Sequence, residues 1–326
     1  MDDHNEQLVY GEESSNLDSG AEAFQPAVKP TLHSAMRLYL VIFILLIIFG
    51  SIFQLIHFEI GMILTQVLII LLPAIWYWKR YRVNLASFAR LKPLSIRFVP
   101  IIILLSASMW VMNMVFAALM VTGLIEIGYE PTVVLAPPVS FSEYLLYLLV
   151  LSFFAGICEE MLFRGAIMPS MESKGLVPAL VFSSFLFALF HVSILNLFST
   201  FILGLVMAIV VVKTGSIWGG VIYHMLNNFY AATYLYFVGQ METVAEVDDG
   251  SLIALLPLFI IALVGAYLGF RLLQKHSVIA PLWGRGEGLL PRGWFGWILA
   301  VSLLIYLVII FFELAVGFGW FGLDLL

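Results

Sequence analysis

The sequence predicts an all-α fold, a polytopic transmembrane helix bundle of about nine spans with a cytoplasmic N terminus. Its composition is the first observation behind this prediction. Apolar residues make up 62% of the 326 residues and charged residues 11%, whereas typical soluble domains have about 45–50% and about 25%. A soluble fold would have too few polar residues to cover so much apolar surface. The single cysteine, Cys158, excludes an internal disulfide framework and a cysteine-rich metal module.

Residues 1–36 form the only long polar segment. It contains seven acidic residues, namely Asp2, Asp3, Glu6, Glu12, Glu13, Asp18 and Glu22. Because it holds few apolar side chains to offset the entropy of ordering, we expect a disordered acidic cytoplasmic tail. The segment also lacks the basic start, short apolar stretch and cleavage site of a signal peptide.

The second observation is a series of apolar segments close to the 20 or so residues that cross a bilayer about 30 Å thick. The predicted spans are 37–56, 60–78, 98–125, 141–165, 177–194, 197–212, 217–238, 252–273 and 294–316. They must be helices, since lipid offers no hydrogen-bond partner to an open backbone. The spans before residue 136 form an N-terminal group (37–135), and those after residue 240 form a C-terminal group (241–326).

The third observation is the placement of the basic residues. They lie before the first span or after the second, fourth, sixth and eighth spans, at Lys29, Arg37, Lys79, Arg80, Arg82, Arg90, Lys92, Arg97, Lys174, Lys213, Arg271, Lys275, Arg285 and Arg292. Of the 15 Lys and Arg residues, these fourteen are predicted on one side of the membrane, and the fifteenth, Arg164, lies near that side at the end of the fourth span. Basic loops stay in the cytoplasm, so this alternation predicts the cytoplasmic N terminus.

Ionisable residues inside apolar spans are costly and point to a function. The first group lies in the fourth span and consists of Glu159, Glu160 and Arg164. Glu160 and Arg164 are one helical turn apart, a spacing that favours an ion pair. This pair would leave Glu159 free for proton chemistry. Glu313 in the last span is assigned no role.

Two further groups follow on neighbouring spans. Phe187 stands four residues before His191, and His224 stands four residues before Asn228. Alone, each of these histidines or the asparagine could be an interhelical hydrogen-bonding residue. Together with the glutamates they predict one polar site, and the segment 136–240 that carries them is the predicted catalytic core.

Two chemistries fit these side chains. A glutamate and a histidine can activate a water molecule, while a second histidine and an asparagine amide donate to the developing oxyanion. Alternatively, Glu159, His191 and His224 have the ligand types of a catalytic zinc ion. The sequence has no H-E-x-x-H or G-x-S-x-G motif, and a lone buried cysteine is usually a small apolar residue.

These motifs resemble those of the CPBP (CAAX protease and bacteriocin-processing, or Abi) intramembrane proteases. The resemblance covers roughly residues 140–235 and rests on Glu-Glu-Met-Leu-Phe-Arg-Gly at 159–165, Phe-Ala-Leu-Phe-His at 187–191 and His-Met-Leu-Asn-Asn at 224–228. The family includes the Ras-converting CAAX endopeptidases and proteins similar to lysostaphin-resistance proteins. The resemblance implies catalytic roles for Glu159, His191, His224 and Asn228, supported by Glu160, Arg164 and Phe187.

The resemblance therefore implies an intramembrane endopeptidase that hydrolyses a peptide bond of a membrane-associated protein, with a prenylated, CAAX-type protein as one candidate substrate. Its partners would be that substrate and the bilayer, with no nucleic acid, and its only cofactor, if any, zinc. The location would be the plasma membrane of a prokaryote or the endoplasmic-reticulum-type membrane of a eukaryote. Two other hypotheses stay open: a non-catalytic scaffold or bacteriocin-immunity protein of the same fold, and a proton-coupled transporter.

One feature of the predicted spans conflicts with this site. Glu159 would lie about 9 Å from the end of its span, whereas His191 would lie more than about 20 Å from Lys174 along its own helix, at 1.5 Å per residue. Either the boundaries between 166 and 197 differ from those predicted, or helix tilt brings the two together.

Overall fold

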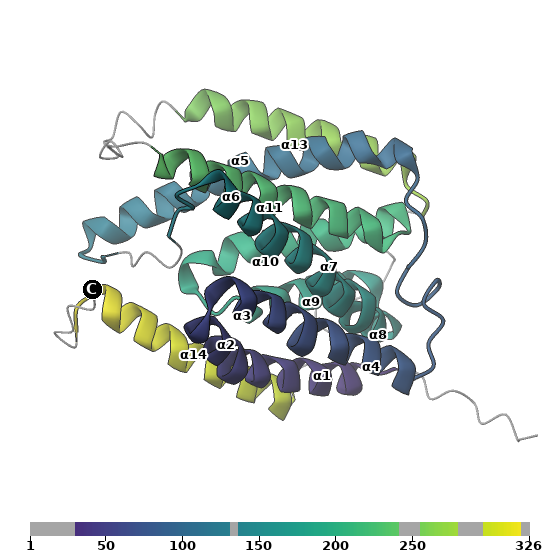
Figure 1. Cartoon of the computed structure of the whole chain (residues 1–326). Helices are drawn as coiled ribbons and strands as arrows, with labels where there is room; N and C mark the ends of the chain where they lie inside the picture. The colour runs from purple at the N-terminus through teal and green to yellow at the C-terminus, as the bar shows by residue number, and fades with distance from the viewer. Residues whose placement is uncertain (1–29, 131–135, 241–254, 280–295, 321–326) are drawn as a thin grey trace, which may run out of the picture.

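The computed structural model describes residues 30–130, 136–240, 255–279 and 296–320. These parts of the chain form an all-α bundle and contain no strand, which confirms the predicted fold class. The helices run side by side in Figure 1. Residues 1–29, and with them most of the predicted acidic tail, lie outside the described residues.

The first two spans form a helical hairpin. The elements are α1 (Leu32–Leu45), η1 (Leu46–Gly50) and α2 (Ser51–Ile56), then α3 (Phe58–Leu64), η2 (Thr65–Leu71) and α4 (Leu72–Arg80). Here η1 and η2 are π-helical stretches within otherwise α-helical rods. The first helix begins at Leu32 rather than at residue 37, because Thr31 and Ser34 form a capping box that satisfies its first backbone N–H groups.

Three long helices flank the bundle. They are α5 (Val99–Glu126), preceded by the 3-10 turn η3 (Ile96–Phe98), α13 (Leu256–His276) and α14 (Trp297–Gly317). Helix α13 packs along α5, and α14 packs against α1 at the opposite edge of the bundle (Figure 1).

The centre of the bundle is built from the segment with the three motifs. Its elements are α6 (Phe141–Tyr147), η4 (Leu148–Phe154), α7 (Ala155–Leu162), η5 (Phe163–Ile167), α8 (Met168–Met171), η6 (Glu172–Lys174), α9 (Leu176–Phe190), α10 (Ile194–Thr214) and α11 (Ile217–Gly239). The helical rod from Phe141 continues to Lys174, so the predicted end at residue 165 is wrong. It continues because residues 163–171 are all buried except Pro169, packed against α1, α4 and α9, instead of leaving the bundle.

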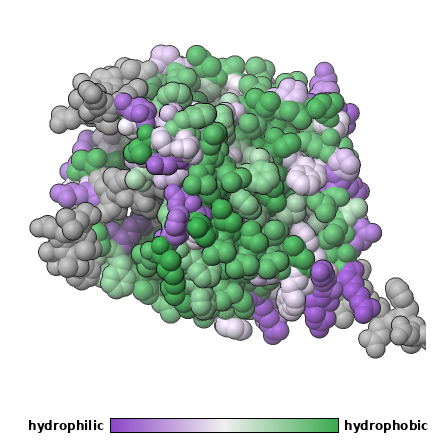
Figure 2. Space-filling model, viewed as in Figure 1, coloured by the Kyte–Doolittle hydropathy of each residue, from purple (hydrophilic) through white to green (hydrophobic). Residues whose placement is uncertain are grey.

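Seven helices of the described chain are long and apolar enough to cross a membrane. Helix α9, with 15 residues, is shorter, and α11 is not among the seven. The protein is an integral, multi-pass membrane protein, while nine spans and a cytoplasmic N terminus stay predictions. Figure 2 shows apolar side chains covering the middle of one face, with the hydrophilic ones mainly toward its sides.

Candidate functional site

One residue from each of the three motifs lines a single cavity. Glu159 comes from α7, His191 from the turn after α9, and Asn228 from α11, and the cavity has a volume of about 340 Å³. Its other lining residues are Met62, Gln66, Leu151, Ala155, Ala231, Ala232 and Leu235. The cavity is therefore mostly apolar with a few convergent polar groups, which is typical of a binding site.

The predicted ion pair between Glu160 and Arg164 is present. Arg164 Nη1 donates to Oε1 of Glu160 at 2.6 Å, and both side chains are fully buried. Nη2 of the same guanidinium donates to the carbonyl oxygen of Gly204 on α10 at 2.6 Å. A Cβ at position 204 would lie 3.3 Å from Nη2 and 3.1 Å from the Phe187 ring, so a glycine permits this close approach. The pair thus joins α7 to α10.

Glu159 is held by a residue that the sequence analysis missed. Gln66 Nε2, on the π-helical stretch η2, donates to Oε1 of Glu159 at 2.8 Å. Oε2 of Glu159 has no hydrogen-bond partner among the described residues, although the side chain is only 7% exposed. Gln66 is not ionisable, because its amide is neutral, so charge does not distinguish it from the rest of its span. A buried amide within an apolar span was the available signal.

His191 is oriented by its own helix. Its Nδ1 lies 2.9 Å from the carbonyl oxygen of Phe187. A carbonyl oxygen can only accept, so Nδ1 carries the proton in the neutral imidazole and Nε2 keeps a lone pair. The ring is therefore a base with its free nitrogen available to the cavity that His191 lines.

His224 and Asn228 occupy different positions on α11. His224 does not line the cavity: its Nε2 lies 4.0 Å from Oε2 of Glu159, and its Nδ1 lies 3.4 Å from Oε1 of Glu160 without hydrogen-bond geometry. Asn228 lines the cavity, and its Nδ2 donates to the carbonyl oxygen of Leu151 at 2.7 Å. That bond uses one of its two amide N–H groups.

The Phe187 ring contacts three of the polar side chains. The ring centroids of His191 and His224 lie 4.8 and 5.8 Å away, both edge-on. The Arg164 guanidinium lies 4.7 Å from the same ring, at cation–π distance. Phe187 thus fixes the spacing of the histidines in the bundle.

Glu313 reaches this region from α14. Its Oε1 accepts from the Ser193 hydroxyl and its Oε2 from the backbone N–H of Ile194, both at 2.8 Å. Tyr306, also on α14, donates to the carbonyl oxygen of Ser193 at 3.1 Å. Glu313 therefore caps α10 and holds the turn that begins at His191, where Val192 has a strained φ of 48°.

The helix boundaries remove the conflict in depth between Glu159 and His191. The turn at Gly175 separates a helix ending at Lys174 from one starting at Leu176. Glu159 and His191 each lie about 15 residues from this turn, or about 22 Å along the two helices. Antiparallel neighbours of equal length bring the two side chains to the same depth.

The described residues contain no group of three or more His, Cys, Asp and Glu side chains placed to hold a metal ion. The alternative set of Glu159, His191 and His224 is thus not assembled as a ligand shell. Oε1 of Glu159 instead accepts from an amide, and Nδ1 of His191 faces a carbonyl oxygen.

A bundle of membrane-spanning helices with glutamate, histidine and asparagine around an internal cavity has the side chains of an intramembrane hydrolase. The comparison with protein families specifies this class. Residues 141–230 match the family described as Rce1-like, type II CAAX prenyl endopeptidase Rce1-like. The match confirms, over these residues, the CAAX protease family that the motifs indicated, and it supports a protease. No curated protein and no solved structure matches the chain.

Proposed function

We propose that this protein is a glutamate-type intramembrane endopeptidase that cleaves near the prenylated C terminus of a membrane-anchored CAAX protein. The observation that carries the proposal is the convergence of Glu159, His191 and Asn228 on one cavity within the matched segment. The mostly apolar lining suits a lipid-modified peptide.

In the proposed reaction, water lies in the cavity between the carboxylate of Glu159 and the imidazole of His191. Glu159 takes a proton from the water as the oxygen attacks the scissile carbonyl, while His191 orients the water. The negative charge that develops on the carbonyl oxygen is stabilised by the second N–H of Asn228. The sequence also predicts a donor at His224, although its ring lies outside the cavity lining. Glu159 then returns the proton to the leaving amine, and the peptide bond breaks.

Three contacts support this division of roles. The ion pair with Arg164 occupies Glu160, so Glu159 is the glutamate left for the reaction. The Phe187 carbonyl sets the tautomer of His191. Gln66 fixes one oxygen of Glu159, while the other oxygen is buried and has no hydrogen-bond partner among the described residues. We assign no metal to the mechanism, since the chain's own base and oxyanion donors complete it.

The test is a cleavage assay with the purified full chain in nanodiscs. A farnesylated CAAX peptide should be cleaved after the prenylated cysteine, as identified by mass spectrometry, and the unprenylated peptide should be cleaved much more slowly. Activity should survive extensive chelation. Equal cleavage of both peptides would contradict prenyl recognition, and loss of activity on chelation with recovery on adding zinc would contradict the metal-free mechanism.

Gln66→Leu should lower kcat about 10- to 100-fold with little change in KM. The substitution removes a hydrogen bond to a charged group, worth about 1.5–3 kcal/mol, and leaves Glu159 without its fixed orientation. Steady-state kinetics on the same peptide measures the effect. Gln54→Leu on α2, which does not line the cavity, is the matched control. An unchanged kcat for Gln66→Leu would show that Gln66 has no part in orienting Glu159 for the reaction.

Glu313→Ala should also lower kcat, by about 10- to 100-fold, because misplacing a catalytic group by 1 Å has an effect of this size. It releases the turn after His191 without touching the cavity lining. Ser302→Ala is the control, since that hydroxyl bonds only within its own helix, to Ile298 at 2.9 Å. If Glu313→Ala shifted thermal stability but left kcat unchanged, Glu313 would stabilise the fold without positioning His191 for catalysis.

A further inference from the structure

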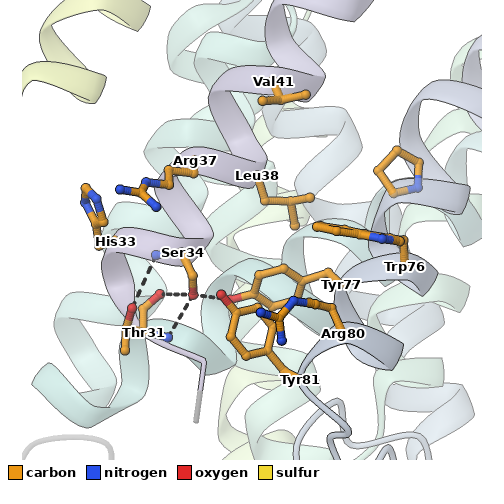
Figure 3. A pocket seen from close by; sticks show the side chains of 11 residues that line it. Thr31, His33, Ser34, Arg37, Leu38, Val41, Trp76, Tyr77, Arg80 and Tyr81 are labelled. Atoms are coloured by element: carbon orange, nitrogen blue, oxygen red, sulfur yellow. Dashed lines mark hydrogen bonds between the residues drawn. The ribbon is translucent and has the colours of Figure 1, made fainter. Parts of the chain in front are cut away.

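A second cavity lies between the start of α1 and the end of α4. Its volume is about 460 Å³, and it shares no lining residue with the cavity of Glu159. Figure 3 shows its side chains. We call it the α1–α4 groove; it is lined by Thr31, His33, Ser34, Arg37, Leu38, Val41, Pro73, Trp76, Tyr77, Arg80 and Tyr81.

One part of the groove is cationic. Arg37 on α1 and Arg80 on α4 are both exposed, and neither forms an ion pair within the described part of the chain. Among the residues that the structure describes, no carboxylate lines the groove. Guanidinium groups bind phosphate with bidentate geometry and strong charge-assisted hydrogen bonds. The groove is therefore complementary to a phosphate group.

Three hydroxyl groups on the groove wall, those of Thr31, Ser34 and Tyr77, already have hydrogen-bond partners within the protein. Ser34 Oγ lies 2.7 Å from the Tyr77 hydroxyl, which lies 2.9 Å from Ser170 Oγ. Ser170 in turn donates to the carbonyl oxygen of Ala166 at 2.7 Å. This chain of hydrogen bonds fixes the groove to the helical rod that carries Glu159 and Arg164. The two arginines are the charged groups of the groove that can bind an outside anion, although Arg80 also lies 5.8 Å from the Tyr81 ring centroid.

The other part of the groove is apolar and open. Leu38, Val41, Pro73 and Trp76 line it, with Val41 55% and Trp76 60% exposed. These residues belong to two helices that are long and apolar enough to cross a membrane, so we expect their exposed sides to face lipid. A free phosphate would use only the arginines, whereas a molecule with an anionic head and an acyl chain matches both parts.

We propose that the α1–α4 groove binds an anionic glycerophospholipid, with its head group at the end lined by Arg37 and Arg80 and an acyl chain over Val41 and Trp76. The predicted orientation places this end of both helices on the cytoplasmic side, where anionic lipids concentrate. This site is independent of the proposed proteolytic function.

The direct test measures lipid retention by native mass spectrometry of the full chain, purified in neutral detergent and given phosphatidylglycerol or phosphatidylcholine. Wild-type protein should retain phosphatidylglycerol preferentially. Arg37→Gln/Arg80→Gln should lower its apparent affinity about tenfold or more. The matched control is Lys79→Gln/Arg82→Gln, which removes the same charge from neighbouring exposed residues outside the groove.

Three results would overturn the proposal. Equal loss in the control variant would indicate diffuse attraction to the basic loop. Equal retention of phosphatidylcholine would remove the requirement for an anionic head. Thermal stabilisation by inorganic phosphate as large as by phosphatidylglycerol would indicate an anion site without a lipid chain.

A second measurement does not depend on the arginine variants folding. Phosphatidylglycerol with brominated acyl chains should quench the fluorescence of wild-type protein more strongly than that of Trp76→Phe, because an acyl chain lies against this ring. Brominated phosphatidylcholine should show a smaller difference between the two proteins. Identical quenching of both proteins by the anionic lipid would contradict the proposed position of the chain.

Discussion

Glu159→Gln is expected to lower the rate of peptide-bond cleavage by about 10²- to 10⁴-fold, the usual contribution of a positioned general base. Glutamine has the same shape, and its amide oxygen can still accept from Gln66 Nε2, now 2.8 Å from Oε1 of Glu159. It cannot take a proton from water. The variant should therefore insert and fold as the wild type does, with the defect confined to kcat.

The measurement is turnover of the prenylated peptide, accompanied by a thermal unfolding curve. Glu143→Gln is the matched control: Glu143 lies on α6, accepts from the backbone N–H of Val139 and does not line the cavity. Full activity of Glu159→Gln would contradict the mechanism. A cellular phenotype that persists in this inactive variant would instead favour the non-catalytic scaffold.

His191→Ala extends the same test. If Glu159 and His191 act on one water molecule, their effects are not additive, since residues that work as a unit fail together. The double variant Glu159→Gln/His191→Ala should be about as inactive as the poorer single variant. If the double variant instead lost activity by the product of the two single-variant factors, the two residues would serve separate steps.

Arg164→Met should have the largest effect on stability. It leaves the fully buried carboxylate of Glu160 without its ion-pair partner, and breaking a buried pair in this way costs about 3–5 kcal/mol. The change also removes the hydrogen bond to Gly204 and the contact with Phe187. Thermal or denaturant unfolding in nanodiscs measures the loss.

Two further variants define the cause. Adding Glu160→Gln to Arg164→Met should recover part of the lost free energy of unfolding, because the uncompensated buried charge is gone. Arg90→Met breaks a two-bond pair with Glu172 at 2.7 and 2.9 Å, but this pair is partly exposed and should be worth about 1 kcal/mol or less. A loss as small in Arg164→Met as in Arg90→Met would contradict the structural role of the buried pair.

The membrane class and the candidate residues of the site follow from local sequence patterns. Composition alone excludes a soluble fold, and the periodicity of an α-helix places Glu160 and Arg164 on one face wherever that helix lies. This is why their ion pair could be predicted and is present. The order and spacing of three motifs similarly indicated the family that the match to residues 141–230 confirms.

Contacts between helices do not follow from spacing within one helix. The sequence contains Gln66 and Glu313 but not the helices that they face, since packing brings η2 to α7 and α14 to the turn after His191. The end of the fourth rod at Lys174 also depends on packing, because a buried helix continues where its neighbours cover it. The oxyanion role of His224 stays a prediction, because its ring lies beside the two glutamates and outside the cavity lining.

The sequence by itself therefore determined the class of protein and which side chains are candidates for the chemistry. Only the tertiary structure decided where the helices begin and end, and which atoms of those side chains already have hydrogen-bond partners. Oε1 of Glu159 and Nδ1 of His191 have partners from the protein, while Oε2 of Glu159 has none among the described residues. The reason is physical: reactivity depends on distances between helices, and these are set by packing of the whole bundle.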